Sequence, residues 1–167
     1  MKNHLHRWVI EALSFMALGL FGSLIIGLIL ETIGNQTLIP QIDLSFLSEI
    51  GKVAMSVTGA AIGVAIAYGL GAKPLVIFSC VIVGTLGYTT FGGGAVGAYI
   101  ATLIVVELSR FYASKTKIDI IVTPLLTIVI GGAIAKLFGP ALNEFMTGLG
   151  KVIIAVSYTH LTLPTKA

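Results

Sequence analysis

The chain has 167 residues and a formal net charge of +3; 56% of its residues are hydrophobic and only 10% are charged. Because ordinary soluble domains carry about 25% charged residues, this composition excludes a water-soluble fold and predicts a protein that folds in a membrane. The basic residues stand singly beside apolar runs, as membrane anchors do, so we expect lipid and not nucleic acid as their partner.

The first predicted span is the apolar run 15–30, which follows a basic and amphipathic N-terminal stretch. The run ends at Glu31 without the small-residue cleavage site of a secretory signal, so we expect this span to be retained. Trp8 suits an anchor at the membrane interface, and Lys2 and Arg7 suit a cytoplasmic N-terminus.

A polar stretch and a second span come next. Polar side chains interleave with apolar ones over residues 31–52, and Pro40 prevents one continuous helix there. This pattern predicts an exterior loop that ends in a short amphipathic helix over residues 44–52. The following run, residues 53–70, is apolar along its length and predicts the second span.

The centre of the chain, residues 53–106, contains a single charge, Lys73, and recurrent glycines. Gly59 and Gly63 form a GxxxG sequence, whose small residues let neighbouring helices approach closely in lipid. The sequence GAKP at residues 71–74 predicts a tight turn, with a glycine ending one helix and a proline starting the next. We therefore expect this region to be the packed centre of a helix bundle.

Short apolar segments follow the turn at residues 75–86 and 95–106, with the flexible, uncharged sequence GYTTFGGG between them. Each is shorter than the about 20 residues that a bilayer crossing needs. They predict either two short tilted spans or a re-entrant pair, and the sequence leaves both open. Glycine-interrupted segments also indicate the binding region of a transporter, because irregular backbone at membrane depth has to line protein or a water-filled cavity.

The last third of the chain begins with a charged cluster. Glu107 and Arg110 are one helical turn apart, so we expect them to pair at a helix end. A further span is predicted over residues 120–138, with a kink near Pro124. Residues 138–151 predict a loop that leads into an amphipathic helix, and the apolar run after it begins another span.

Residues 157–167, SYTHLTLPTKA, are too polar to complete that last span. They resemble the translated adapter sequence found at the ends of truncated reading frames. We therefore expect this tail to be non-native and the natural protein to continue beyond Val156. Residues 1–156 then form one truncated transmembrane domain, an all-α polytopic helix bundle with short glycine-interrupted segments.

Basic residues in short loops indicate which end of a bundle faces the cytoplasm. We place the N-terminus inside and let the glycine-rich pair cross twice. The inside set is then Lys2, Arg7, Lys73, Arg110, Lys115 and Lys117, and the outside set is Lys52, Lys136 and Lys151. A re-entrant pair would invert the later loops, so this orientation depends on that pair.

Catalytic chemistry has no visible machinery in the sequence. No histidine lies within residues 15–156, and no HExxH, GxSxG or GxxxxGK[ST] motif occurs. The one cysteine, Cys80, stands in an apolar run that suits a packing residue better than a nucleophile. We therefore expect no enzyme activity from this chain by itself, no cofactor and no metal site.

Candidate substrate contacts are polar side chains next to or within apolar runs, because ionisable groups at membrane depth are costly and tend to be functional. The selected residues are Glu107, Thr123, Asn143 and Glu144. Carboxylates and amides near a helix end also serve as interfacial anchors or caps, and a threonine hydroxyl also bonds to its own helix backbone. Both interpretations stay open for each residue.

The order of several blocks resembles bacterial phosphotransferase-system enzyme IIC components, of the sugar-permease family that often forms a stand-alone membrane subunit. The blocks are EALSFMALGLFGSLIIGLIL, EIGKVAMSVTGAAIGVAIAYGL, FGGGAVGAYIA, KTKIDIIVTPLLTIVIGGAIA and GPALNEFMTGLG. They lie within residues 1–156, which would be the N-terminal half of a longer family member.

The resemblance implies a permease that binds and translocates a sugar or polyol across the bacterial cytoplasmic membrane. It also implies cytoplasmic phosphoryl-carrier subunits, which bring the phosphoryl group from phosphoenolpyruvate, and a homodimer as partners. On the residues alone, other functions stay open. One is a non-transporting membrane scaffold or sensor whose basic loops dock a cytoplasmic partner, and another is a generic solute channel.

Overall fold

The computed structural model of the chain describes residues 2–36 and 42–161. Pro40 and residues 162–167 of the predicted tail lie outside these ranges. The described part contains helices and turns but no strand, which confirms the predicted all-α fold. In chain order the elements are α1 (Lys2–His6), η1 (Arg7–Glu11), α2 (Ala12–Leu20), η2 (Phe21–Ile25), α3 (Ile26–Gly34), α4 (Ser45–Ser56), α5 (Thr58–Gly69), α6 (Pro74–Thr85), η3 (Leu86–Thr90), α7 (Gly94–Tyr112) and α8 (Asp119–Leu161), the η elements being π-helical.

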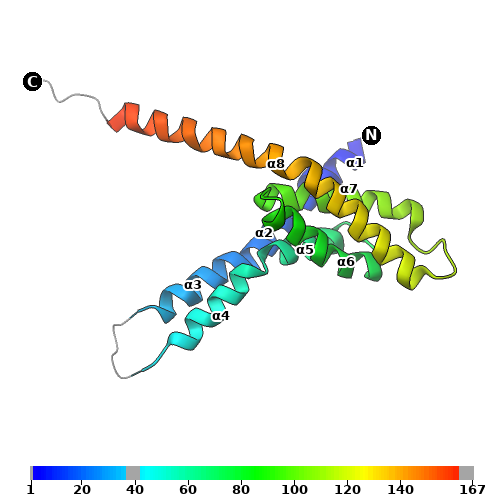
Figure 1. Cartoon of the computed structure of the whole chain (residues 1–167), viewed down its shortest axis with the longest axis horizontal. Coiled ribbons are helices and arrows are strands. Elements are labelled where there is room, and N and C mark those ends of the chain that lie inside the picture. The colour runs from blue at the N-terminus through cyan, green and yellow to red at the C-terminus, as the bar shows by residue number, and fades with distance from the viewer. Residues whose placement is uncertain (1, 37–41, 162–167) are drawn as a thin grey trace, which may run out of the picture.

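A central bundle carries two helical arms (Figure 1). The bundle contains α2, α5, α6, α7 and the first part of α8, which pack against one another. One arm is the hairpin of α3 and α4, and the other is the C-terminal part of α8, which projects alone. The core between α5, α6 and α7 is aliphatic, with Ile62, Ile66, Val83 and Val105 fully buried.

The first predicted span is confirmed as a long helix. The elements from α1 to α3 run on without a break, and Asn3–Gly34 is 32 residues long and apolar enough to cross a membrane. Its hydroxyl side chains bond within the helix: Ser14, Ser23 and Thr32 each donate to the carbonyl four residues earlier. These bonds give the three hydroxyls hydrogen-bond partners, which the lipid tails cannot supply.

The second span is bent at Val57, where α4 and α5 meet at 52°. The helix predicted over residues 44–52 therefore continues to Ser56, and its predicted end was wrong. Packing explains the longer helix, because α4 lies along α3 through two glycines. A Cβ added to Gly27 would lie 2.8 Å from the carbonyl oxygen of Gly51, so neither position tolerates a side chain.

The GxxxG sequence packs as predicted. Gly59 and Gly63 on α5 face Gly84 on α6, and a Cβ added to Gly63 would overlap the carbonyl oxygen of Cys80. A Cβ on Gly59 would lie 2.8 Å from the carbonyl oxygen of Gly84. The helices therefore touch backbone to backbone, an approach that small residues permit.

The turn between α5 and α6 also follows the prediction. Gly71 has a φ of +69°, the left-handed conformation that favours glycine. The N–H of Ala72 donates to the carbonyl of Ala67 at 3.0 Å, which closes the helix end. Pro74 is the first residue of α6.

The helices α6 and α7 form a hairpin joined by the glycine-rich sequence. The predicted flexible linker is partly wrong, because η3 continues α6 into it as helix. The chain then reverses at Gly92 and Gly94, whose φ values are positive, and the N–H of Gly93 donates to the carbonyl of Gly87 at 3.1 Å. Helix α7 is long and apolar enough to cross a membrane, whereas α6 with η3 is shorter. The choice between two spans and a re-entrant pair stays a prediction.

Helix α8 corrects the prediction for the last third of the chain. The sequence predicted a loop within residues 138–151, but α8 is one helix of 43 residues that passes Pro124 and Pro140 without a break. A proline lacks the backbone N–H that would donate to the carbonyl four residues earlier. Each proline therefore removes one backbone hydrogen bond, and α8 stays helical before and after it. Gly139 lies against Phe91, and this contact holds the middle of α8 on the bundle.

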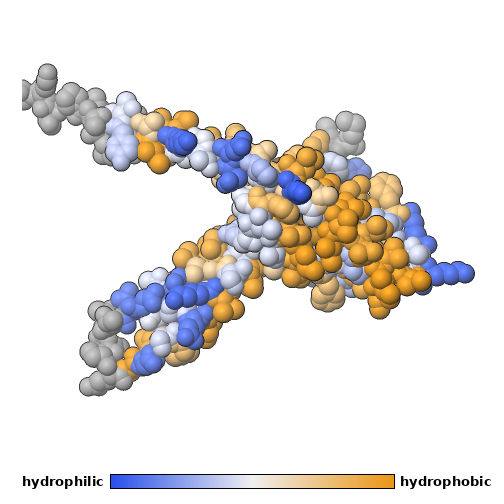
Figure 2. All heavy atoms as spheres, viewed as in Figure 1, coloured by the Kyte–Doolittle hydropathy of each residue, from blue (hydrophilic) through white to orange (hydrophobic). Residues whose placement is uncertain are grey.

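Three helices of the described part are long and apolar enough to cross a membrane, or four if the bent α4–α5 pair counts as one span. The outer surface of the bundle is strongly apolar (Figure 2), and side chains such as Phe78 and Phe111 are 72% and 73% exposed. A continuous apolar surface of this kind belongs in lipid. The structure and the sequence thus agree on a membrane protein.

Candidate functional site

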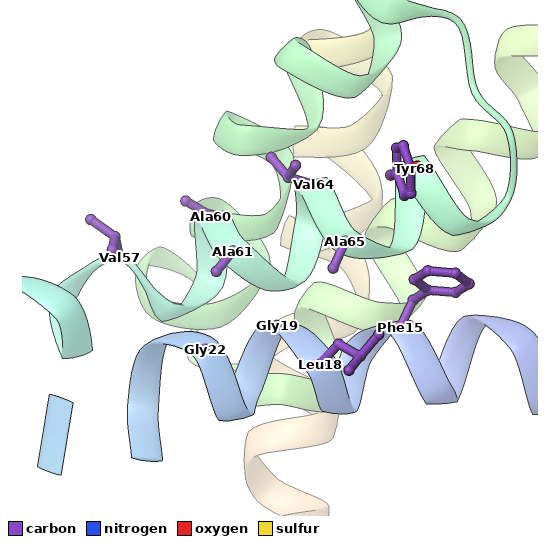
Figure 3. A pocket seen from close by; sticks show the side chains of 10 residues that line it. All are labelled: Phe15, Leu18, Gly19, Gly22, Val57, Ala60, Ala61, Val64, Ala65 and Tyr68. Atoms are coloured by element: carbon purple, nitrogen blue, oxygen red, sulfur yellow. The ribbon is translucent and has the colours of Figure 1, made fainter. Parts of the chain in front are cut away.

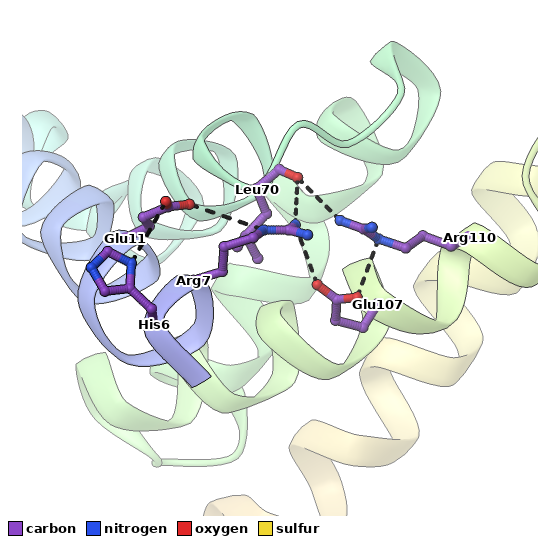
Figure 4. A network of polar contacts seen from close by, with 6 residues as sticks. All are labelled: His6, Arg7, Glu11, Leu70, Glu107 and Arg110. Carbon is purple, nitrogen blue, oxygen red and sulfur yellow. Dashed lines mark hydrogen bonds and ion pairs between the residues drawn. The ribbon is translucent and has the colours of Figure 1, made fainter. Parts of the chain in front are cut away.

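A polar cluster surrounds Glu107 at the end of the bundle where α5 and α7 finish (Figure 4). Nε of Arg110 lies 3.1 Å from one carboxylate oxygen of Glu107, which confirms the predicted pair. Nη2 of Arg7 lies 3.5 Å from the other oxygen. The Glu107 side chain is only 21% exposed, so its carboxylate has lost much of its hydration. The attraction of the two arginines offsets the free energy of that lost hydration.

Both arginines also donate to the carbonyl oxygen of Leu70, Arg7 at 3.1 Å and Arg110 at 3.4 Å. Leu70 follows the last residue of α5, where carbonyls lack partners within the helix and carry partial negative charge. We call Arg7, Leu70, Glu107 and Arg110 the Glu107 cluster. It joins the ends of η1, α5 and α7, which are far apart in the sequence.

The same end of the bundle gathers further basic residues. Lys73 donates to the carbonyl oxygen of Ala113 at 3.2 Å, and Lys115 and Lys117 are exposed in the loop before α8. These residues belong to the set predicted to face the cytoplasm. The structure brings Arg7, Lys73, Arg110, Lys115 and Lys117 of that set to one end, while the orientation itself stays a prediction.

A small slot of about 200 Å³ opens beside Glu107, between η1 and α7. Its lining is apolar except for Glu107 and consists of Trp8, Leu103, Ile104, Glu107, Leu108 and Phe111. The hydroxyl of Tyr99 donates to the backbone carbonyl of Trp8 and fixes η1 against α7. A carboxylate oxygen has two lone pairs, so Glu107 can accept a hydroxyl from the slot while the arginines hold it.

Thr123 lies inside the bundle, one turn into α8. Its side chain is 1% exposed, and its hydroxyl donates to the carboxylate of Asp119. Asp119 also accepts the backbone N–H of Ser114 at 2.7 Å, and the hydroxyl of Thr127 donates to the carbonyl of Thr123 at 2.7 Å. The Thr123 hydroxyl therefore serves the start of α8 in this structure.

Asn143 and Glu144 lie on the other part of α8, where it leaves the bundle. Both side chains are exposed. Asn143 lies beside the glycine-rich turn, since a Cβ added to Gly92 would be 3.7 Å from its Cγ. The structure thus brings Glu107 and Thr123 to the helix ends near the α7–α8 loop and places Asn143 and Glu144 elsewhere, so the selected residues do not share one cavity.

A groove of about 630 Å³ contains none of the selected residues. It runs between α2 and α5 (Figure 3) and is lined by Phe15, Leu18, Gly19, Gly22, Val57, Ala60, Ala61, Val64, Ala65 and Tyr68. The Phe15 and Tyr68 rings close one end, edge to face with their centroids 6.3 Å apart. This apolar lining offers little hydrogen bonding to a sugar. Within the described residues no group of three His, Cys, Asp or Glu side chains could hold a metal ion.

A protein-family model described as "Phosphotransferase system, EIIC" matches residues 10–160. The chain belongs to this family. No curated protein and no solved structure matches it. EIIC components are the membrane transport subunits of the phosphotransferase system, so the predicted membrane location and transport role are confirmed at the level of the family.

Sequence reasoning missed two members of the Glu107 cluster in this EIIC chain. It used Arg7 only as a sign of a cytoplasmic N-terminus, and nothing in the sequence marks the carbonyl of Leu70. The available signal was weak: a basic residue at one span end and an acidic residue at another can meet only if both ends face the same side. Testing that condition requires the topology.

Proposed function

We propose that this EIIC chain binds and translocates a sugar or polyol across the bacterial cytoplasmic membrane as the permease of a phosphoenolpyruvate-dependent system. The family match over residues 10–160 carries this proposal. The apolar bundle with polar groups at its two ends supports it, because a carrier needs hydrogen-bonding groups where the solute enters and leaves.

The proposed substrate contacts fall into two groups. Asn143 and Glu144 are exposed beside the glycine-rich turn, so an amide and a carboxylate are available to sugar hydroxyls there. Glu107 and Thr123 already hold protein partners. We therefore assign the first contact with the solute to Asn143 and Glu144, and assign Glu107 and Thr123 to the end with the basic residues.

The proposed partners follow from that basic end. Arg110, Lys115 and Lys117 are exposed there, and opposite charges on a protein partner steer its association. We propose that the cytoplasmic phosphoryl-carrier subunits dock at this end and supply the phosphoryl group, so that this chain is not an enzyme by itself. We also propose that it works as a homodimer.

The decisive experiment measures uptake of labelled sugars and polyols by cells that express the natural gene, with and without the phosphoenolpyruvate-dependent carrier proteins. Uptake that needs the carriers, and that falls at least tenfold in Asn143→Ala and Glu144→Gln, is the expected result. Carrier-independent uptake would indicate a channel, and no uptake of any tested sugar or polyol would indicate a scaffold. Either result would overturn the proposal.

A matched control uses Thr147→Ala. Thr147 lies one turn further along α8, and its hydroxyl donates to the carbonyl of Asn143. Removing this exposed hydroxyl should leave uptake within twofold of the unaltered protein. If Thr147→Ala lowers uptake as much as Asn143→Ala does, the effect comes from the shape of α8 and the assignment of Asn143 is wrong.

A further inference from the structure

The apolar groove between α2 and α5 is as long as one leaflet of a bilayer is deep (Figure 3). Its lining on α5 runs from Val57 to Tyr68, which is about 17 Å of helix at a rise of about 1.5 Å per residue. The hydrocarbon core of a bilayer is about 30 Å thick, so one leaflet supplies roughly 15 Å of it. The groove therefore has the length that one lipid tail occupies.

The groove is open along its side and lined by small side chains between its exposed rims. Leu18, Val57 and Tyr68 on the rims are 61%, 47% and 69% exposed. Apart from the backbone of its own helical turns, no atom lies within 4 Å of a Cβ added to Gly22. At membrane depth such a space takes an apolar occupant, because its lining gives water almost no hydrogen-bond partner.

Charged side chains of both signs lie just beyond one end of the groove (Figure 4). Glu11 precedes Phe15, a residue of the groove lining, by one helical turn and so lies on the same face of the helix. Across the groove α5 ends at Leu70, whose carbonyl oxygen accepts from both Arg7 and Arg110. The apolar groove thus leads directly to a polar group of the kind that a lipid headgroup meets.

These charges keep the capacity to bind a ligand. The Glu11 side chain is 43% exposed, and the atoms of its basic neighbours are 4.0 Å away, longer than a hydrogen bond. The Arg110 side chain is 47% exposed, and a guanidinium carries five N–H donors, so it can donate to a phosphate oxygen while it holds Glu107. An exposed carboxylate and an exposed guanidinium therefore flank Arg7 at this end of the groove.

We propose that the groove binds one phospholipid whose headgroup carries a primary amine. One acyl chain lies between α2 and α5, the phosphate accepts hydrogen bonds from Arg110, and the ammonium donates to Glu11. A headgroup with only negative charge leaves Glu11 without a cation, and a choline headgroup has no N–H to donate, so the two signs of charge favour the amine. The proposal goes beyond the transport function and is independent of the transported solute.

Native mass spectrometry tests the headgroup preference. The protein is expressed from the natural gene, stripped of lipid in detergent and titrated with phosphatidylethanolamine, phosphatidylcholine or phosphatidylglycerol that carry identical acyl chains. We expect one tightly bound phosphatidylethanolamine per chain, with a dissociation constant at least fivefold below those of the other two lipids. Equal constants for the three lipids would overturn the proposal.

Gly22→Leu tests the position of the acyl chain, because its side chain would enter the open space of the groove. This variant should weaken phosphatidylethanolamine binding at least fivefold. Gly148→Leu is the matched control, since a Cβ added there likewise meets nothing beyond its own helical turns, and it should leave binding within twofold. Protection of the buried Cys80 from maleimide checks that both variants are folded.

Two results at Gly22 would contradict the proposal. If a folded Gly22→Leu protein binds phosphatidylethanolamine unchanged, the lipid lies elsewhere. If Gly22→Leu instead separates a dimer into monomers and leaves lipid binding unchanged, a second copy of the chain occupies the groove.

Glu11→Gln tests the ammonium contact and does not depend on the groove variant. The amide keeps the size of the side chain and removes its charge, so the preference for phosphatidylethanolamine over phosphatidylcholine should fall from at least fivefold to less than twofold. Glu49→Gln is the control, because Glu49 is an exposed carboxylate on the α3–α4 arm, and it should keep the full preference. A preference that survives Glu11→Gln, or that both variants lose equally, would show that Glu11 does not bind the headgroup and would refute the proposal.

Discussion

The carboxylate of Glu107 lies 3.5 Å from the guanidinium of Arg7, a residue 100 positions earlier in the chain. Glu107 also pairs with Arg110, and both arginines donate to the carbonyl oxygen of Leu70. One carboxylate therefore connects the N-terminal helix to α7 and, through the shared carbonyl, to the end of α5.

Replacing Glu107 should loosen this end of the bundle. In Glu107→Gln the arginines lose their anionic partner, and we expect a loss of about 1–2 kcal/mol in the free energy of unfolding, less than for a fully buried pair because the site is partly exposed. Thermal unfolding in detergent, followed by a thiol-reactive dye that reports exposure of Cys80, measures the change.

The control is Glu11→Gln, because Glu11 lies 4.0 Å from both Arg7 and His6 and its side chain is 43% exposed. Exposed pairs of this kind contribute about 0–1 kcal/mol, so its unfolding temperature should hardly change. If Glu107→Gln and Glu11→Gln lower the unfolding temperature equally, Glu107 contributes no more to stability than an exposed surface charge does.

The contact between α5 and α6 predicts a strong effect at Gly63. A Cβ there would overlap the carbonyl oxygen of Cys80, which belongs to backbone and cannot turn aside. We expect Gly63→Ala to cost about 2–3 kcal/mol, as overpacking of a tight core does. Gly148→Ala on the arm is the matched control, because nothing beyond the backbone of its own helical turns lies within 4 Å of its added Cβ; that change should be neutral or slightly stabilising. The yield and unfolding temperature of the purified proteins check both.

Cys80 should be inert in the folded protein. Its side chain is fully buried between helices, so a maleimide should not reach it. We expect less than a tenth of the protein to be labelled in mild detergent and nearly all of it after unfolding in sodium dodecyl sulfate, as mass spectrometry would show. Rapid labelling of the folded protein would mean that the α5–α6–α7 core opens readily.

The arrangement of basic residues predicts the orientation. Lys115 lies at the end that carries the basic residues, and Lys52 lies on the α3–α4 arm; both side chains are exposed. In a Cys80→Ala background, Lys115→Cys should react with a membrane-impermeant maleimide only in inverted vesicles, and Lys52→Cys only in intact cells. The reverse pattern would place the N-terminus outside.

Several parts of the fold were predictable from local patterns. The GAKP turn and the GxxxG contact depend on residues a few positions apart, so the conformational freedom of glycine and the fixed φ of proline were enough. The pair of Glu107 and Arg110 was predictable for the same reason. The unbroken α8 was not, because Pro140 ends many helices, and only the contact of Gly139 with Phe91 shows how the bundle holds this one.

By itself, the sequence determined the membrane environment, the all-helical fold and the family, because these depend on composition and on the order of apolar blocks. The tertiary structure alone decided which polar groups meet. It paired Arg7 with Glu107, enclosed Thr123 with Asp119, and left Asn143 beside Gly92. The physical reason is that helix formation is set by neighbours in the chain, whereas a charge or hydroxyl takes the partner that packing brings within hydrogen-bonding distance.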